Sequence, residues 1–338
     1  MQGRIVGCFL IALVDLCAVA GMARHGRMEV KAASVQPTAQ LVTVQPGVKL
    51  EVLDWGGPAN ARPLVFLAGL GDTAHIFDNF APQFTAKYRV YGITRRGFGN
   101  SSKPEPTDAN YSADRLGEDV VAVIDALKLD RPVVAGHSIA GEELSWIGNH
   151  DPQKVAGLIY LDADWGPGFY DKARGDNWID MLDVRHRIEA LRGGAVYDTA
   201  YREGLTAAID QLSRDLRAEA ARDAALPNLP AGPAPPPIPL AVLFGEEKFT
   251  GIHTAAMDIV ACPHDMTPMF RGPLEHDTAA QKAMEVDDLQ HCRSQSTAFG
   301  AAMPWAPVVR IPNANHHVFV SNPEVVERAM NDFLSKLR

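Results

Sequence analysis

Short apolar segments alternate with amphipathic segments along most of the chain, and this alternation constrains the fold more than any other feature. The short segments are apolar almost throughout, which is typical of strands buried on both faces of a parallel sheet. The amphipathic segments repeat apolar residues at helical spacing. The pattern therefore predicts an α/β fold with a mostly parallel, doubly wound sheet. The apolar segments are "RPLVFLAG", "YRVYGITRRG", "RPVVAG", "KVAGLIYLDA", "AAMDIVACPHD" and "APVVRIP".

Four segments are predicted to be helices that cover this sheet. The first begins at Ser112, a favourable N-cap residue, and continues with apolar residues at helical spacing to residue 129. Before the parallel strands, "LVTVQPGVKLEVLDWGG" predicts a hairpin of two alternating strands around Pro46 and Gly47. The other three predicted helices cover residues 138–150, 275–299 and 323–337.

The alternation stops between residues 164 and 239 and resumes afterwards. Two helical segments and a proline-rich connector, "LPNLPAGPAPPPIP", fill this region. We expect a helical cap inserted into a core made of residues 41–163 and 240–338. Four aromatic residues of this region either line a pocket or pack the cap against the core: Trp165, Phe169, Tyr170 and Trp178.

Residues 1–20 resemble a signal peptide. A short cationic start is followed by an apolar run, and "AVA" before Gly21 reads as a cleavage site. Asp15 interrupts the run, so no stable membrane span is predicted. We expect export to the periplasm or the medium. A cytoplasmic protein is the alternative, if translation starts at Met22 or Met28.

The net charge of −9 argues against nucleic acid or an anionic membrane surface as a partner. Of the four cysteines, Cys8 and Cys17 lie in the predicted signal peptide. Cys262 and Cys292 remain, and the sequence leaves open whether they form a disulfide. The cysteines follow neither a C-x-x-C nor a zinc spacing.

"VVAGHSIAGEELS" places Ser138 between an apolar strand and a helix, with small residues on both sides. A nucleophilic serine occupies such a sharp strand-to-helix turn, in which bulky neighbours would collide. Ala140 stands where the G-x-S-x-G motif has its second glycine, and it is still small. The alternative is a serine that caps an ordinary helix.

A serine nucleophile needs a general base, and a base of this kind needs an acid that orients it. "NANHHVFVSNPE", between the last strand and the last helix, offers His316 and its neighbour His317. For the acid, Asp265 competes with Glu246 and Glu247. The strand before Glu246 and Glu247 is too close to the next strand for a helical crossover, whereas a full helix lies between the strand of Asp265 and the last strand. We therefore predict Asp265 as the acid.

The oxyanion formed during acyl transfer requires hydrogen-bond donors. The amide of Ile139, directly after Ser138, is one candidate. The amide of Leu70 in "FLAGLGD" is the second, because Gly69 and Gly71 let this loop approach closely. An ordinary glycine turn is the alternative.

Five segments in order resemble the α/β-hydrolase superfamily, which includes esterases and lipases, over about residues 41–337. "FLAGLGDTAHIFDNF" is similar to its oxyanion loop and "GITRRGFGNSSKP" to the segment after the next strand. "AGHSIAGEE", "ACPHDMTP" and "NANHHVFVSNPE" are similar to the nucleophile, acid and histidine segments. The distance from the histidine to Pro323 selects His316 over His317. Ala68, Thr94, Ala140 and Asn315 depart from the family's usual residues.

The resemblance implies a serine hydrolase that cleaves an ester or related acyl bond through an acyl-enzyme. Ser138, His316 and Asp265 would be the triad, the amides of Leu70 and Ile139 the oxyanion hole, and a small-molecule ester the substrate. No metal or organic cofactor is implied. Alternatives are an acyltransferase or carbon–carbon hydrolase with the same triad, or a non-catalytic binding protein.

Overall fold

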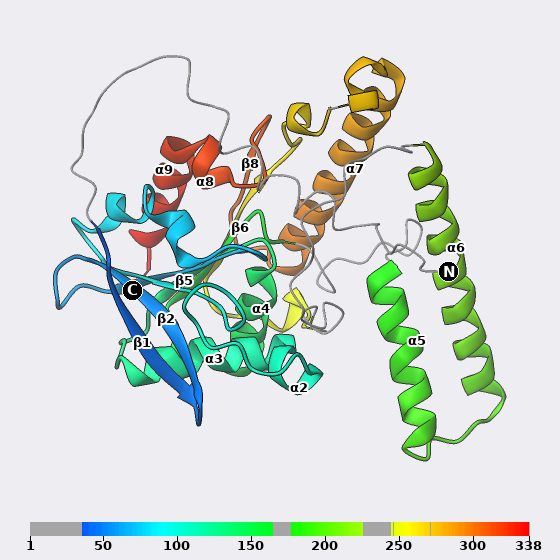
Figure 1. The fold of residues 1–338 in the computed structure, drawn as a ribbon, viewed down its shortest axis with the longest axis horizontal. Coiled ribbons are helices and arrows are strands. Elements are labelled where there is room, and N and C mark those ends of the chain that lie inside the picture. The colour runs from blue at the N-terminus through cyan, green and yellow to red at the C-terminus, as the bar shows by residue number, and fades with distance from the viewer. Residues whose placement is uncertain (1–35, 165–176, 226–244, 246, 271, 338) are drawn as a thin grey trace.

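The computed structural model describes residues 36–164, 177–225, 245, 247–270 and 272–337. Eight strands form one sheet in the order β1-β2-β4-β3-β5-β6-β7-β8. The contacts of β2 with β1 and β4 are antiparallel, and all other strand pairs are parallel. The predicted α/β sheet is therefore confirmed (Figure 1). The strands are β1 Thr38–Gln45, β2 Val48–Gly56, β3 Pro63–Leu67, β4 Arg89–Ile93, β5 Val133–His137, β6 Gly157–Leu161, β7 Ala256–Ala261 and β8 Val308–Ile311.

Both faces of the sheet are buried at the central strands β3, β5, β6 and β7, as their continuously apolar sequences predicted. Along β3, Leu64 and Phe66 pack into one hydrophobic cluster, whereas Val65 and Leu67 pack into a second. This two-residue alternation follows from the pleat of a strand. One cluster includes residues of α8 and α9, and the other includes residues of α3, α4 and α7. These helices are α3 Ala113–Ala126, α4 Ala140–His150, α7 Thr278–Ala302, α8 Val318–Ser321 and α9 Pro323–Leu334.

The starts of two helices are set by side-chain caps. Ser112 accepts a hydrogen bond from the amide of Arg115, as its position before α3 predicted. Helix α7 begins three residues later than the predicted start at residue 275. The reason is Asp277, which caps the amide of Ala280.

The predicted cap region contains two long helices, α5 (Asn177–Arg192) and α6 (Thr199–Ala225), which pack side by side (Figure 1). Arg185 of α5 forms an ion pair with Asp108 of the short helix α2 (Asp108–Tyr111). The proline-rich connector, residues 165–176 and the side chain of Trp178 lie outside the described residues. The proposed pocket-lining aromatics and the domain boundaries therefore stay predictions.

Residues 1–20, the predicted signal peptide, also lie outside the described residues. Where the structure does describe helices, none has both the length and the apolar surface that a membrane crossing requires.

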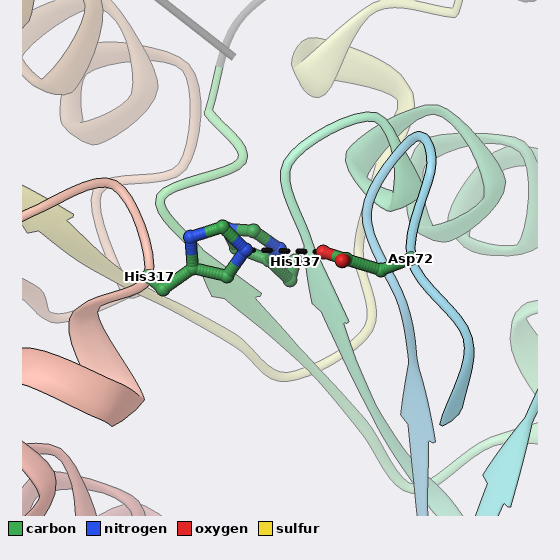
Figure 2. Close-up of side chains that lie close together, drawn as sticks. All are labelled: Asp72, His137 and His317. Atoms are coloured by element: carbon green, nitrogen blue, oxygen red, sulfur yellow. Dashed lines mark hydrogen bonds and ion pairs between the residues drawn. The ribbon is translucent and has the colours of Figure 1, made fainter. Parts of the chain in front are cut away.

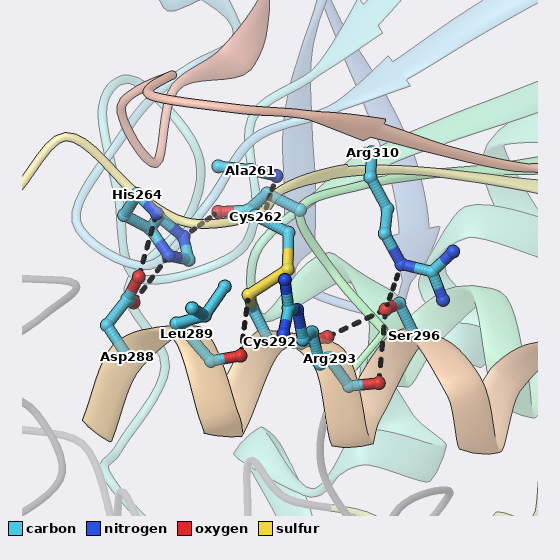
Figure 3. Close-up of a disulfide and its surroundings, with 10 residues drawn as sticks. Ala261, Cys262, His264, Asp288, Leu289, Cys292, Arg293, Ser296 and Arg310 are labelled. Atoms are coloured by element: carbon cyan, nitrogen blue, oxygen red, sulfur yellow. Dashed lines mark hydrogen bonds and ion pairs between the residues drawn. A yellow bond between two sulfur atoms is a disulfide. The ribbon is translucent and has the colours of Figure 1, made fainter. Parts of the chain in front are cut away.

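Cys262 and Cys292 are joined by a disulfide, which answers a question that the sequence left open (Figure 3). Cys262 follows β7 directly, and Cys292 lies in α7, so the bond ties the end of one strand to the helix packed beside it. Their Cα atoms are 5.5 Å apart.

Candidate active site

Ser138 occupies a sharp turn between β5 and α4. Its φ of 55° lies in the left-handed region, which non-glycine residues adopt rarely and mostly where the surrounding structure enforces it. Its amide donates to the carbonyl oxygen of Leu161 at the end of β6. A Cβ added at Gly136 would lie 3.0 Å from the Cβ of Ala140. The turn therefore needs glycine at position 136 and accepts alanine at position 140.

Gly141, the glycine that comes one residue late in the motif, has its own structural reason. A Cβ at this position would lie 2.1 Å from the carbonyl oxygen of Ala163. Helix α4 therefore presses directly against the segment that follows β6. This contact brings Ser138 and the residues after β6 to the same edge of the sheet.

His316 lies in the loop after β8, at the same edge. Its Nδ1 is 2.6 Å from Oδ2 of Asp162, and its Nε2 is buried without a hydrogen-bond partner among the described residues. The backbone carbonyl of His316 accepts a hydrogen bond from Nε2 of His137. His316 is thus held at both its ring and its backbone, while one ring nitrogen stays available for a proton.

Asp162, directly after β6, is the carboxylate that orients His316. Its Oδ1 accepts from the amide of Ala261, and its Oδ2 accepts from His316 and, at 2.8 Å, from Nε2 of His264. Burial alone would raise the pKa of Asp162, but the two imidazoles outweigh it and hold the pKa far below the usual range. Asp162 therefore stays ionised.

Asp265, the acid predicted from the sequence, does not contact His316. Its carboxylate accepts from the amide of Thr267, two residues on. The reason is the path of the chain after β7, where His264 forms a parallel bridge with Ala314 and is the residue that reaches Asp162. Of the rival glutamates, Glu247 pairs with His150 at 2.5 Å, and Glu246 lies outside the described residues.

His264 extends the chain of charged groups beyond Asp162. Its Nδ1 is 2.7 Å from Oδ1 of Asp288 on α7, and its amide donates to Oδ2 of the same residue (Figure 3). Burial would lower the pKa of His264, but Asp162 and Asp288 outweigh it and raise the pKa well above the usual value. His264 is therefore an imidazolium between two carboxylates, and the disulfide lies beside it on the same strand end and helix.

His317, the rival of His316, faces a different partner. Its Nε2 is 3.0 Å from Oδ2 of Asp72, in the loop after β3 (Figure 2). The ring of His137 lies against it, with centroids 4.5 Å apart. Burial, together with the neighbouring His317 and His316, lowers the pKa of His137 well below the usual value, so its ring is neutral.

The loop with the predicted oxyanion donor lies against the turn that carries Ser138. A Cβ added at Gly69 would lie 3.3 Å from the Cβ of Ser138. Within the described part of the chain, the amides of Leu70 and Ile139 donate no hydrogen bond, so both are available to a ligand. Both predicted donors thus lie on the two segments that meet at Ser138.

A buried ion pair joins these two segments. Arg95, after β4, donates to both carboxylate oxygens of Glu143 on α4, at 2.6 and 2.9 Å. It also donates to the carbonyl oxygens of Ala68 and Gly69, at 3.1 and 3.3 Å. Arg95 therefore links the Gly69 loop, residues 68–72, to the helix that begins after Ser138.

A family model described as the alpha/beta hydrolase family matches residues 64–329. The chain belongs to the alpha/beta hydrolase family. Solved structures agree on the fold of this alpha/beta hydrolase. A hydrolase from Pseudomonas aeruginosa PA01 has a TM-score of 0.56 at 19% identity, and the match covers 88% of this chain and 98% of the other. Est816, described as an enzyme that degrades N-acyl homoserine lactones, has a TM-score of 0.52 at 20% identity, covering 87% and 100%.

Curated relatives of this alpha/beta hydrolase match over shorter stretches. A non-heme chloroperoxidase from Streptomyces lividans is 33% identical over 124 residues, which are 36% of this chain and 44% of the relative. A 3-oxoadipate enol-lactonase from Acinetobacter baylyi is 32% identical over 107 residues, 32% of this chain and 39% of the relative. The chain thus spans less than half the length of these two relatives.

The sequence reasoning missed Asp162, His264 and Asp288. A signal for Asp162 was present, because it follows a buried strand directly, as Ser138 does. The candidates for the acid, Asp265, Glu246 and Glu247, all follow later apolar segments, and Asp162 at the end of β6 was not among them. Asp288 lies within a helix, so no comparable sequence signal marks it as a functional residue.

Proposed function

We propose that this protein is a serine hydrolase that cleaves esters or related acyl bonds through a covalent acyl-enzyme. The observation that carries the proposal is Ser138 in a strained turn at the sheet edge where Asp162 holds His316, whose Nε2 has no partner in the described part of the chain. The proposed triad is Ser138, His316 and Asp162, with Asp162 in place of Asp265. The similarity to a relative named as a 3-oxoadipate enol-lactonase supports an ester or lactone substrate.

In the proposed mechanism, Oγ of Ser138 attacks the acyl carbon while Nε2 of His316 takes its proton. Asp162 fixes His316 in the tautomer with a proton on Nδ1 and stabilises the imidazolium that forms. The amides of Leu70 and Ile139 donate to the developing oxyanion. His316 then protonates the leaving group, and water, activated by the same histidine, releases the acid.

A fluorophosphonate probe tests the nucleophile. The wild-type protein should be labelled at Ser138, and the Ser138→Ala variant should not. Labelling of the variant at another residue would contradict the proposal. Turnover of aryl and alkyl esters of graded acyl length, and of lactones, then defines the substrate class. Added alcohols or amines compete with water, so ester or amide products would indicate acyl transfer instead of hydrolysis.

We also propose that the protein is exported. The Cys262–Cys292 disulfide supports this location, because such bonds persist in oxidising compartments and are rare in the cytosol. Fractionation of expressing cells, with N-terminal sequencing of the mature chain, tests the proposal. We expect the chain outside the cytoplasm, starting at Gly21. Full-length protein in the cytosol would contradict it.

A further inference from the structure

Three side chains that the proposed mechanism does not use form a second cluster next to the nucleophile. Asp72 comes from the loop after β3, His137 from the end of β5, and His317 from the loop after β8. One ligand atom from each lies within 4.8 Å of the others (Figure 2). Segments far apart in the sequence thus bring two imidazoles and a carboxylate together.

The hydrogen bonds of this cluster leave one position unfilled. Nε2 of His137 donates to the carbonyl oxygen of His316, so in a neutral ring Nδ1 carries a lone pair. Nδ1 is buried and has no hydrogen-bond partner among the described residues, and the whole His137 residue is only 1% exposed. A buried acceptor without a partner costs free energy, and native structures rarely leave one unsatisfied.

This lone pair faces the loop that carries the carboxylate. A Cβ added at Gly69 would lie 2.7 Å from Nδ1 of His137, so only a glycine leaves that side of the ring open. Figure 2 shows the rings of His137 and His317 side by side, both directed toward Asp72. Nδ1 of His137 thus lies beside the loop of Asp72 without a donor among the described residues, and a cation bound between the three side chains would satisfy it.

We propose that Asp72, His137 and His317 bind a divalent transition-metal ion, for which zinc is the best match. Two imidazoles and one carboxylate form a common ligand set for zinc, and imidazole is a poor ligand for calcium or magnesium. Zinc binds nitrogen and oxygen at about 2.0–2.2 Å, so the three side chains have to move together by on the order of 1 Å. The side chains of Asp72 and His317 are each 12% exposed, which gives the ion a path from solvent.

The other aspartate–histidine–histidine cluster is a poorer metal site. Asp162, His264 and His316 also place ligand atoms within 4.8 Å of one another. There, however, Asp162 already accepts hydrogen bonds from both histidines, and the second nitrogen of His264 is bonded to Asp288. A metal ion at this cluster would have to replace protons that already take part in hydrogen bonds.

The bound ion would connect the three segments that carry the amide of Leu70, the hydroxyl of Ser138 and the ring of His316. Each proposed ligand is within two residues of one of these groups in the sequence. The proposal does not rest on the hydrolase activity. It holds equally for a protein whose nucleophile has been removed.

Zinc titration of the tag-free chain tests the site. The protein is treated with EDTA, dialysed, and titrated with Zn²⁺ in a calorimeter and with Co²⁺ in a visible spectrometer. The variants Asp72→Asn and His317→Gln remove ligands, and Ser138→Ala separates metal binding from activity. His75→Gln is a matched control, because His75 forms an exposed pair with Asp78 at 2.8 Å. His264→Gln tests the other cluster.

We expect one ion per chain, with an affinity at least ten-fold lower in Asp72→Asn and His317→Gln and unchanged in His75→Gln and Ser138→Ala. Zn²⁺ should also raise the melting temperature of the wild type, because it binds only the folded chain. Circular dichroism checks that each variant is folded. Absence of binding by the wild type would overturn the proposal. So would loss of binding in His264→Gln with retention in Asp72→Asn, or loss in His75→Gln.

Discussion

Two clusters, each made of one aspartate and two histidines, lie beside Ser138 and differ in the hydrogen bonds of their ring nitrogens. Around Asp162, every N–H of His264 and the Nδ1–H of His316 have a carboxylate partner. Around Asp72, the buried acceptor Nδ1 of His137 has no donor among the described residues. The first arrangement suits a histidine that must be held in one orientation, and the second suits a cation. Residue types alone therefore do not distinguish a carboxylate that orients a histidine from a candidate metal site.

The strongest test of this comparison is Asp162→Asn. The loss of the carboxylate favours the wrong tautomer of His316, so ester turnover should fall by about 10³–10⁴-fold. The matched variant Asp265→Asn should change turnover by a few-fold at most, because its carboxylate only caps a local turn. Steady-state kinetics on one ester measures both. The reverse order would restore Asp265 as the acid and remove the distinction between the clusters.

Of the two clusters, only the Asp162 cluster should be disturbed by loss of the disulfide. Cys262 and Cys292 are 30 residues apart, and closure of such a loop stabilises the folded state by about 3–4 kcal/mol. The double variant Cys262→Ser/Cys292→Ser should therefore lose about that much in urea unfolding. Its turnover should fall too, since Asp288 lies one helical turn before Cys292. A larger loss of zinc affinity than of turnover would contradict this prediction, because it would show that the disulfide supports the Asp72 cluster more than the Asp162 cluster.

His264→Gln should weaken the hold on Asp162 without removing it. A hydrogen bond to a charged group contributes about 1.5–3 kcal/mol, so turnover should fall by roughly ten- to hundred-fold. The fold raises the pKa of His264 above 6.5, so its contribution to stability is complete below pH 6.5 and is lost as the pH rises through the folded-state pKa.

The melting-temperature difference between wild type and His264→Gln should therefore be larger at pH 6 than at pH 10. A difference that grows with pH would mean that His264 is not an imidazolium. His150→Gln serves as a control, because His150 forms a more exposed pair with Glu247.

Asp72→Asn should have the smallest effect of these changes. Whereas Asp162→Asn should lower turnover, Asp72→Asn should leave the stability of the metal-free protein unchanged or raise it. In the metal-free protein, the asparagine oxygen can still accept from His317, and its NH₂ group can donate to Nδ1 of His137. We expect stability to be unchanged or raised by about 0.5–1.5 kcal/mol in urea unfolding. A clear loss would show that His137 is already satisfied in solution and would remove the difference between the clusters.

The fold was predictable because each local sequence pattern is compatible with only one structural arrangement. Continuously apolar strands require cover on both faces, and "GHSIAG" permits a tight turn only with glycine at 136 and a small residue at 140. Ser138, His316 and the two candidate amide donors could be predicted as site residues because they follow strands at one sheet edge. The site differed at the acid, since Asp265 and Asp162 both follow strands and only the path after β7 decides between them.

The proposed metal ligands and the contact between His264 and Asp288 could not be predicted in this way. Asp72, His137 and His317 come from three separate segments, so no spacing in the sequence connects them. Asp288 is one polar residue among several on α7, and only the strand end beside that helix gives it a partner. Such contacts depend on register and helix position to within about one residue, which apolar patterns do not determine.

The buried pair of Arg95 and Glu143 fixes the Gly69 loop and helix α4 as one rigid unit. In the proposed hydrolase, the segments that carry the amides of Leu70 and Ile139 are therefore already tied together before a substrate binds. Amides held in this way would need little reorganisation when the proposed oxyanion forms between them. Entropy that a flexible loop would lose in each encounter is lost here only once, at folding.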